Sequence, residues 1–490
     1  MISAETRKKY TATIGIECHV QLRTKTKLFS AVSNEAYEAS PNTLISHIDL
    51  GMPGALPVLN KKAVDYAISI AFAFNTRPQK YSYFERKHYF YPDLPKGYQI
   101  TQLAKPIIVG GYVTIDVDGK SKDIRLNRVQ MEEDAGKSMH PEGKDYSLVD
   151  LNRAGTPLLE VVSEADMHSA AEAKAYAKEL YLIARYTDVS LADMYKGNIR
   201  FDVNVSVSKT DALGTRSETK NLNSFRSVEK AVEYEINRQI ELLEKGEKVV
   251  QETRGWNDAK QKTFSQRSKE EAHDYRYFPE PDIPPLDLDE AWITLIEKNM
   301  PVMPAEWRQR LSGLGLDSQQ ISTLFDAQEE TNADYLSLIE ANLEDKERAK
   351  TYANWIVNYE IPFRRAIPGG LNDHSSRWPV YDQLYNLQVK NKLSSNSVKA
   401  LMIELLKLHK VQLPVSIEKY AEEKGYIQVS DEAEIEAIVK EVIQENQTAA
   451  QDVKNGEMKA IGFLVGQVMK KSQGKANPEL AQELIKKVLR

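Results

Sequence analysis

The sequence contains a single cysteine, Cys18, among 490 residues. One thiol excludes an internal disulfide and a thiolate zinc or iron–sulfur site, so the fold must be held by burial alone and suits a reducing compartment. The longest mostly apolar runs, such as 67–74, are far shorter than the roughly 20 residues that cross a bilayer. The N-terminus also lacks the pattern of a signal peptide. We therefore expect a protein that is neither exported nor inserted into a membrane.

Several common catalytic and nucleotide-binding motifs are also missing. The sequence has no Gly-x4-Gly-Lys-Ser/Thr, no Gly-x-Gly-x-x-Gly and no Gly-x-Ser-x-Gly. Any ATP chemistry therefore does not use a P-loop, and a dinucleotide fold or a serine-hydrolase elbow is not indicated. Cys18 lies on the apolar side of its expected strand, together with Ile16 and Val20, which predicts a core residue rather than a nucleophile.

Charge is abundant but nearly balanced. Lys and Arg number 65 against 71 Asp and Glu, a net charge of −6, and 41% of the residues are hydrophobic. The length predicts about three domains with real cores. The acidic balance argues mildly against a chain coated for nucleic acid, although an average does not describe patches. Residues 418–453 contain ten acidic and three basic side chains, and residues 454–490 contain eight basic and three acidic ones, so charge is segregated in this tail.

The first 290 residues mix strand and helix patterns. Strict alternation over 14–22 and 201–208 predicts strands with one apolar face, and Asp118-Gly119 predicts a hairpin turn. Helical patterns occupy about 168–187 and 226–246. The segment 277–285 has four prolines, which marks a boundary, and helical periodicity dominates beyond it. These patterns predict an α+β protein whose first domain is rich in antiparallel strands.

Three polar strand faces are candidates for chemistry. The first carries Glu17 and His19, two residues apart and about 7 Å from one another, so both can reach one ion. A solvated strand face explains that pair equally well. The second carries Asp202, Asn204 and Ser206. The third, if 218–225 begins as a strand, carries Glu218 and Lys220. We expect the three faces to converge on the floor of one polar cavity.

Two further segments mix charge with special neighbours. Three adjacent carboxylates in Glu132-Glu133-Asp134 are typical of a solvated turn or of a magnesium site. Lys137 and Arg153 flank this segment and can contact phosphate or carboxylate groups. The run 84–91 interleaves cations with aromatic rings, which suits stacking on a base and equally suits an amphipathic strand packed on a core.

Long ordered motifs resemble one known family. The motifs are Ile14-Gly15-Ile16-Glu17-Cys18-His19-Val20-Gln21-Leu22, the segment 51–60, the segment 86–99, Glu132 to Lys137, the segment 149–160, Lys220 to Phe225, the segment 274–282, and, in the tail, 460–469 and 474–478. Together they resemble the GatB/GatE family, whose bacterial members are the GatB subunits of the aspartyl/glutamyl-tRNA(Asn/Gln) amidotransferase. The resemblance covers nearly the whole chain.

The resemblance implies a domain plan and an activity. It implies a cradle domain over 1–293, a helical domain over 294–410 and a YqeY-like, tRNA-binding tail over 411–490, the last two all-α. The implied enzyme is a glutamine-hydrolysing ligase. It phosphorylates the side-chain carboxylate of misacylated Glu-tRNA(Gln) or Asp-tRNA(Asn) with ATP, and ammonia from a glutaminase subunit then replaces the phosphate. A carboxylate oxygen is a poor leaving group, which is why activation is required.

Site residues follow from the same resemblance, position by position. The implied metal ligands are Glu17, His19, Glu133 and Glu160, the implied catalytic residues are Glu133, Glu218, Asp202 and Lys220, and the residues assigned to ATP are Arg86, Lys87, Arg153, Asn204 and Ser206. The implied cofactors are Mg²⁺ and ATP. The implied partners are the glutaminase subunit and the small clamp subunit of a heterotrimer, misacylated tRNA and the misacylating synthetase, in the cytoplasm and without a membrane.

The sequence departs from the family pattern in two places. Tyr195 and Lys196 stand where the family has an acidic pair, which alters the charge at one rim of the expected cavity. The segment 27–33 lacks the cysteines with which some members bind zinc, so no zinc is expected.

Two other function classes compete with the ligase. A non-catalytic tRNA-binding scaffold would use only the basic tail, and the metal-type residues Glu17, His19 and Glu133 argue against it. An unrelated metal-dependent hydrolase would act without a partner or RNA.

Overall fold

The computed structural model describes residues 2–268, 274–331, 335–366, 378–408, 413–428, 432–455, 457, 459–472 and 476–489. By its internal contacts the chain divides into two units, Met1–Trp307 and Arg308–Arg490. The division lies within helix α6, Pro304–Gly313. The predicted three-domain plan with boundaries at 293 and 410 stays a prediction.

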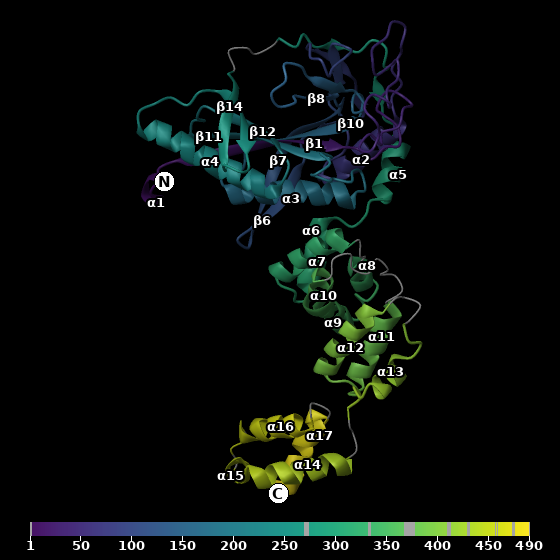
Figure 1. Ribbon diagram of the computed structural model, residues 1–490, viewed down its shortest axis with the longest axis vertical. Helices are drawn as coiled ribbons and strands as arrows, with labels where there is room; N and C mark the ends of the chain where they lie inside the picture. The colour runs from purple at the N-terminus through teal and green to yellow at the C-terminus, as the bar shows by residue number, and fades with distance from the viewer. Residues whose placement is uncertain are drawn as a thin grey trace. The chain divides into compact units, whose positions relative to one another are not determined.

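The first unit contains all the described strands and is drawn in purple to teal in Figure 1. Its elements are α1 (Ala4–Arg7), β1 (Thr11–Gln21), α2 (Lys61–Ala73), β2 (Tyr81–Ser82), β3 (Glu85–His88), β4 (Tyr98–Thr101), β5 (Ile108–Val109), β6 (Tyr112–Val117), β7 (Lys120–Glu133), β8 (Lys137–Met139), β9 (Leu148–Asp150), β10 (Pro157–Ser163), α3 (Ala170–Tyr186), β11 (Ile199–Ser208), β12 (Ser217–Leu222), α4 (Phe225–Glu244), β13 (Glu252–Asn257), β14 (Lys262–Ser268), β15 (Phe278–Pro279), β16 (Leu286–Asp287) and α5 (Glu290–Lys298).

A nine-stranded sheet organises this unit. Its order is β14-β13-β12-β11-β1-β10-β7-β5, and β6 also pairs with β7. All neighbours run antiparallel except β12 and β13, which are parallel. The antiparallel-rich α+β class is therefore confirmed. The N-terminal strand β1 lies in the middle of the order, so its residues have neighbours from both halves of the sheet.

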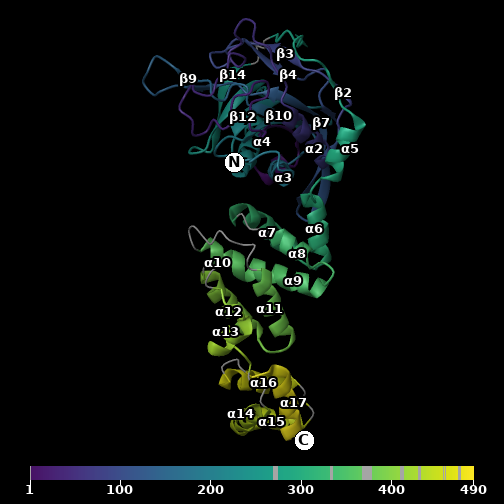
Figure 2. The same ribbon diagram turned by 90° about the vertical axis from the view of Figure 1, so that its right-hand side faces the viewer.

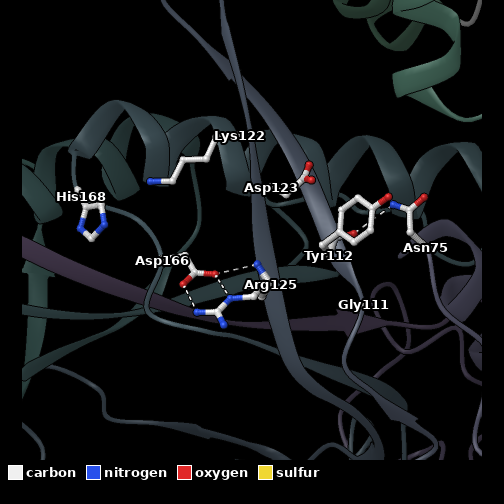
Figure 3. A pocket seen from close by; sticks show the side chains of 8 residues that line it. All are labelled: Asn75, Gly111, Tyr112, Lys122, Asp123, Arg125, Asp166 and His168. Carbon is white, nitrogen blue, oxygen red and sulfur yellow. Dashed lines mark hydrogen bonds and ion pairs between the residues drawn. The ribbon is translucent and has the colours of Figure 1, made fainter.

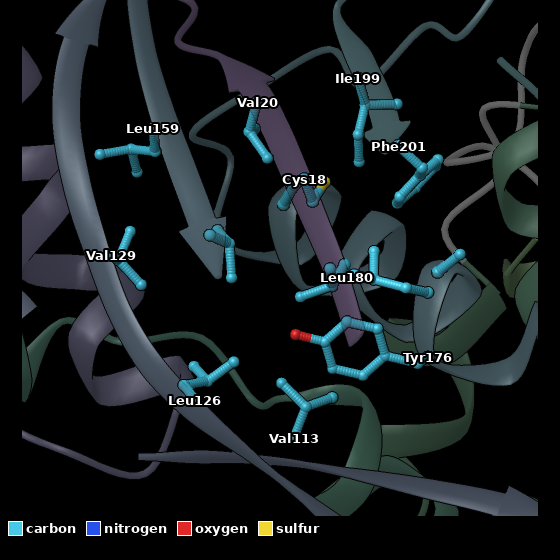
Figure 4. Packing of buried hydrophobic residues seen from close by; sticks show 14 of the residues in the cluster. Cys18, Val20, Val113, Leu126, Val129, Leu159, Tyr176, Leu180, Ile199 and Phe201 are labelled. Carbon is cyan, nitrogen blue, oxygen red and sulfur yellow. The ribbon is translucent and has the colours of Figure 1, made fainter. Parts of the chain in front are cut away.

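The two faces of the sheet differ because the strands alternate. On one face Cys18, Val20, Leu159, Val129 and Phe201 are buried and pack toward helices α3 and α4 (Figure 4). Cys18 is fully buried, as predicted, and burial raises the pKa of its thiol well above the usual value. The same alternation places the intervening polar side chains on the opposite face.

The local elements follow from local chemistry. Asp118 and Gly119 have φ angles of 51° and 74° and join β6 to β7 in a two-residue turn, which confirms the predicted hairpin. Helices α3 and α4 each begin at a serine, Ser169 and Ser224, whose hydroxyl accepts a backbone N–H of the first turn. Both helices lie within two residues of their predicted bounds.

A three-stranded sheet, β15-β3-β4, packs beside the polar face of the large sheet. Strand β15 comes from the proline-rich segment predicted only as a boundary. It pairs with β3 nearly two hundred residues earlier in the chain, Phe278 opposite Arg86. The Arg86 guanidinium donates to both carboxylate oxygens of Glu280 at 2.6 and 2.8 Å, and Glu280 is buried. The segment thus builds part of the first unit, which continues to Trp307.

The described part of the second unit is helical. Its elements are α7 (Ser318–Thr331), α8 (Tyr335–Glu340), α9 (Lys346–Trp355), the π-helix η2 (Ile356–Glu360), α10 (Ile361–Arg365), α11 (Trp378–Val389), α12 (Ser395–Lys407), α13 (Ile417–Glu423), α14 (Glu432–Glu445), α15 (Gln447–Lys454), α16 (Lys459–Lys471) and α17 (Pro478–Leu489). Helices α14 to α17 share one small core and appear in yellow in Figure 2. Within the described residues, no helix is both long and apolar enough to cross a membrane.

Candidate functional site

The three predicted polar faces meet on one face of the large sheet. Glu17 of β1 lies opposite Asp202 of β11, and Asn204 of β11 lies opposite Glu218 of β12. On the other side of β1, His19 lies opposite Glu160 of β10. Directly opposed residues of paired strands point to the same face, so four central strands contribute to one surface. We call this surface the polar site, and β7 completes it with Gln130 and Glu132.

Two groups of potential metal ligands lie within the polar site. His19, Glu132 and Glu160 form the first group, and Glu17, Asp202 and Glu218 form the second. Within each group the ligand atoms lie within 4.8 Å of one another. We call them the histidine cluster and the carboxylate cluster.

The histidine cluster is an ordered but electrically unbalanced group. Its His19 Nε2 lies 3.6 Å from the Glu132 carboxylate. The Thr101 hydroxyl of β4 donates to Glu132 at 3.1 Å, and the Gln130 amide donates to Glu160 at 2.8 Å. Burial, and then the neighbouring Glu132, raise the pKa of Glu160 to about 7. Within the described residues, no Lys or Arg lies within 4.0 Å of either carboxylate, so neither carboxylate has a Lys or Arg partner in a close ion pair.

The carboxylate cluster already contains a cation. The Lys220 ammonium lies 2.9 Å from both Asp202 and Glu218, and the Asn221 N–H donates to Asp202 at 2.8 Å. Burial disfavours the charged forms, but Lys220 lowers the pKa of Asp202, and the two carboxylates raise the pKa of Lys220. Glu17 lies on the side of the cluster toward the histidine cluster, and burial together with Glu160 and Glu218 raises its pKa.

Glu133, predicted as a metal ligand and catalytic residue, does not lie in either cluster. It follows Glu132 on β7, so its side chain points to the other face of the strand. There it pairs with the Lys96 ammonium and accepts the Ile100 N–H at 2.9 Å. Glu132 occupies the place in the polar site that the sequence-based prediction assigned to Glu133.

Of the residues assigned to ATP, some already form ion pairs or hydrogen bonds with the protein, and others do not. Arg86 is fixed by Glu280 and also stacks on the Tyr98 ring at 4.5 Å. The Lys87 ammonium instead lies 5.0 Å from the centre of the Tyr275 ring. Burial lowers the pKa of Lys87, but Glu132 and other nearby acids raise it further, so the net shift is upward. Lys87 therefore stays charged and belongs to the electrostatic surroundings of the histidine cluster.

The remaining assigned residues have protein partners of their own. The Arg153 guanidinium donates to the carbonyls of Ala135 and Gly136 at 3.0 and 2.7 Å. The Asn204 amide donates to Glu17 at 3.2 Å. Ser206 is buried two residues further along β11, opposite Thr13. Arg153 and Asn204 therefore use donors on the protein around the polar site, which leaves fewer donors for a ligand.

Gln130 and Arg200 of the polar site were not predicted, and Glu132 was named only as part of the acidic run 132–134. A signal for Gln130 and Glu132 was present, because Val129 and Met131 are apolar and alternation places Gln130 and Glu132 on the opposite face. Because successive side chains of a strand point to opposite faces, Glu133 is assigned to the apolar face. Arg200 shares the face of Asp202 by the same rule.

The segment 194–198, in which Tyr195 and Lys196 differ from the family pattern, is a turn at the surface. Tyr195 is 88% exposed, and the Lys196 ammonium lies 4.7 Å from the centre of the Tyr37 ring. Neither residue belongs to the two clusters, so the altered charge affects a surface turn.

A concave pocket of about 680 Å³ lies away from the polar site, near the β6–β7 hairpin (Figure 3). Its cations are already paired: Arg125 forms a two-pronged ion pair with Asp166 at 2.7 and 2.9 Å, and Lys122 pairs with Glu172 at 2.8 Å. The pocket holds none of the predicted site residues.

Comparison with known proteins gives consistent results for both units. The family model described as the GatB/GatE catalytic domain matches residues 12–294, and the one described as the GatB domain matches residues 337–489. Relatives named as the B subunit of an aspartyl/glutamyl-tRNA(Asn/Gln) amidotransferase occur in Carboxydothermus hydrogenoformans, at 42% identity over 98% of both chains, and in Thermodesulfovibrio yellowstonii, at 44% identity over 98% of this chain and all of the relative. A third, from Persephonella marina, is 44% identical over 97% of this chain and 99% of its own.

Proposed function

Because the chain belongs to the GatB/GatE family, we propose that its polar site is the centre at which an aminoacyl-tRNA carboxylate is activated and amidated. The chain is the GatB subunit of a tRNA-dependent, glutamine-hydrolysing amidotransferase, which is an ATP-dependent ligase acting with partner subunits. The finer assignments below, to particular residues, cofactors and partners, extend that conclusion.

The histidine cluster supports a divalent cation at the polar site. Two carboxylates and an imidazole are within reach of one ion, and no Lys or Arg in the described residues pairs with either carboxylate within 4.0 Å. An unpaired buried charge is costly, which is why Glu160 retains its proton up to about pH 7 without a cation. Oxygen-rich ligand sets suit hard cations such as Mg²⁺. This group of three ligand atoms, which no Lys or Arg of the described residues pairs with, is the observation that carries the proposal.

His19, Glu132 and Glu160 would hold the cation, which neutralises charge on the phosphate groups of ATP during transfer. The carboxylate cluster has a different role because Lys220 already pairs with two of its three carboxylates. Lys87, which has no carboxylate partner within 4.0 Å in the described residues, faces the phosphates. We assign no zinc to the chain.

The chemistry proceeds in two balanced steps. First, an oxygen of the glutamyl or aspartyl side chain attacks the γ-phosphorus of ATP, the bond from that phosphorus to the β,γ-bridging oxygen breaks, and ADP leaves. Second, ammonia attacks the acyl carbon, the bond to the phosphate oxygen breaks, and inorganic phosphate leaves with the electron pair. The nitrogen loses a proton in this second step. Glu218, which is partly exposed and held by Thr253 at 3.1 Å, accepts it.

The partners follow the chemistry. A glutaminase subunit supplies ammonia, a small clamp subunit completes the heterotrimer, misacylated tRNA(Gln) or tRNA(Asn) supplies the carboxylate, and the misacylating synthetase hands over that tRNA. These reactions place the chain in the cytoplasm. The tail over 411–490 contacts the tRNA through the basic residues of 454–490.

Reconstitution with both partner subunits, ATP, Mg²⁺, glutamine and misacylated tRNA tests this function. We expect Glu132→Gln to lower amide formation by about 10²-fold or more, because one carboxylate of the cation cluster is lost. Arg125→Gln is the matched control, since Arg125 lies on the same strand but pairs with Asp166 at the distant pocket (Figure 3). Glutaminase activity should survive in both variants.

The competing hypotheses predict other outcomes. If Glu132→Gln leaves amide formation and tRNA-dependent ATP turnover unchanged, the polar site is not the catalytic centre. The scaffold hypothesis then remains. Hydrolysis of a substrate by this chain without partner subunits or RNA would favour a hydrolase.

A further inference from the structure

Arg200 is a cation of the polar site that uses few of its donors on the protein. Lys220 is shared by two carboxylates and Lys96 is paired with Glu133. Arg86 uses two nitrogens on Glu280. In the described residues, Arg200 makes a single hydrogen bond, from Nη2 to Asp134 at 2.9 Å. Its other nitrogens have no hydrogen-bond partner in the described residues, and the side chain is 20% exposed.

The position of Arg200 is central to the polar site. It lies on β11 directly opposite His19 of β1, and two residues before Asp202 on the same face. Glu132 and Asp202 are near enough to raise its pKa, after Asp134, yet neither comes within the 4.0 Å of an ion pair. The guanidinium therefore lies beside both clusters without being bound to either. A guanidinium presents several N–H donors in one plane, which matches phosphate and carboxylate oxygens.

Asp134 holds Arg200 in this position. One Asp134 oxygen contacts Arg200 at 2.9 Å and Arg153 at 3.3 Å, so a single carboxylate serves two guanidinium groups. The Asp134 backbone is fixed as well, because its N–H donates to the Thr156 carbonyl and its own carbonyl accepts from Gly155. A carboxylate shared in this way leaves the other N–H donors of Arg200 unused. Arg200 is thus fixed in orientation before a ligand arrives and retains attraction for an anion.

We propose that Arg200 is a catalytic residue that donates hydrogen bonds to the phosphoryl group as it passes from ATP to the aminoacyl carboxylate. The inference rests on the proposed function, since it names a residue for that reaction. While the new oxygen–phosphorus bond forms and the bond to the β,γ-bridging oxygen breaks, negative charge is spread over the three other phosphoryl oxygens. The free donors of Arg200 stabilise that charge, and the proton balance is unaffected because arginine stays protonated.

Steady-state kinetics of the reconstituted complex test this role through the split between kcat and KM. Arg200→Lys keeps the charge and the reach to Asp134 but loses the planar donors. We expect kcat for tRNA-dependent ADP formation to fall about 10²–10³-fold, with the KM for ATP changed less than about threefold. In Arg200→Ala, added guanidinium ion at millimolar concentration should restore part of the rate. Arg125→Gln, an exposed arginine already paired with Asp166, should behave as wild type.

The outcomes separate this role from the others. A kcat for Arg200→Lys within threefold of wild type overturns the proposal, because positive charge alone would then be sufficient. A large loss that guanidinium does not restore, together with lost divalent-cation binding, also overturns it and makes Arg200 a structural residue. If the wild-type complex itself forms no ADP with misacylated tRNA, the proposed function fails and this assignment falls with it.

Discussion

At the scale of the residue, the neighbouring Glu132 and Glu133 lie in different surroundings and are expected to have different roles. Glu132 joins the histidine cluster, and Glu133 forms a buried ion pair with Lys96. We expect Glu132→Gln to weaken binding of Mn²⁺ or Mg²⁺ at least tenfold, because one of two carboxylate ligands is lost. We expect Glu133→Gln to change cation affinity less than about threefold but to cost roughly 3 kcal/mol of stability, since it leaves Lys96 buried without its charge partner.

Titration of the isolated chain with Mn²⁺ by electron paramagnetic resonance, alongside urea unfolding, measures both quantities. The reverse pattern, with affinity lost in Glu133→Gln and kept in Glu132→Gln, would return the metal ligand to the position that the motif indicated. Equal losses of affinity in both variants would mean that the ion pair and the cluster act as one unit.

The residue scale also shows where sequence reasoning succeeds. Glu17, His19, Asp202 and Asn204 share one face because strand alternation is a strictly local property, and the structure brings them together. The convergence of their strands was predicted without the register. The assignment of Glu133 came from the family motif, whereas the parity that Val129 and Met131 define places Glu132 on the polar face. Arg200 was not singled out, although alternation places it on the same face as Asp202.

At the scale of the element, helix α4 anchors the half of the sheet that carries Glu218. Its fully buried Glu235 accepts from Ser217 of β12 at 2.6 Å and contacts Arg254 of β13 at 3.0 Å. A parallel pair such as β12 and β13 has no short turn to set its register. The sequence did not predict this pairing, or that of β15 with β3, because both join strands separated by long connections.

We expect Glu235→Gln to destabilise the chain by about 3–5 kcal/mol at pH 7, because buried arginines lose their counter-charge. Burial raises the pKa of Glu235, but Arg238 and its hydrogen-bond donors lower it further, so the folded value lies below the ordinary one. This stability is therefore present above the unfolded pKa, about 4.3, and is lost as the pH falls through the folded pKa. The difference between wild type and variant should shrink toward pH 3.

Urea unfolding at pH 7 and at pH 3.5 measures this difference. Glu229→Gln is the control on the same helix, because Glu229 pairs with Lys174 at the surface and should cost less than about 1 kcal/mol at either pH. A penalty for Glu235→Gln that stays constant between the two pH values would show that its charge is not what holds the strands.

At the scale of the whole molecule, the average charge of −6 conceals parts with different duties. The polar site concentrates acids for a cation. In the tail, the sequence separates an acidic segment, 418–453, from a basic segment, 454–490. In the structure, residues of the two segments form ion pairs with one another. Lys471 of α16 pairs with Glu445 of α14 at 2.6 Å, and Lys487 of α17 pairs with Glu432 at 3.1 Å. Part of the basic segment therefore balances the acidic one.

The lysines that remain available define the last prediction. Lys459 and Lys470 are exposed on α16, and within the described tail neither forms an ion pair. Helical spacing places both on the side of Phe463, which is 51% exposed. We expect the double variant Lys459→Gln/Lys470→Gln to weaken tRNA binding by the complex roughly tenfold near 0.1 M salt. The slope of log affinity against log salt should fall by about 1.5, because two phosphate contacts are lost.

The matched control is Lys471→Gln/Lys487→Gln, which removes the same charge from the same region of the tail. Both of those lysines already have acidic partners, so the control should change affinity and salt slope far less. Filter binding across a salt series, with glutaminase activity as the check on assembly, measures both variants. Equal losses in the two pairs would mean that the tail attracts RNA by net charge alone, and no loss in either would move the RNA contact away from α16.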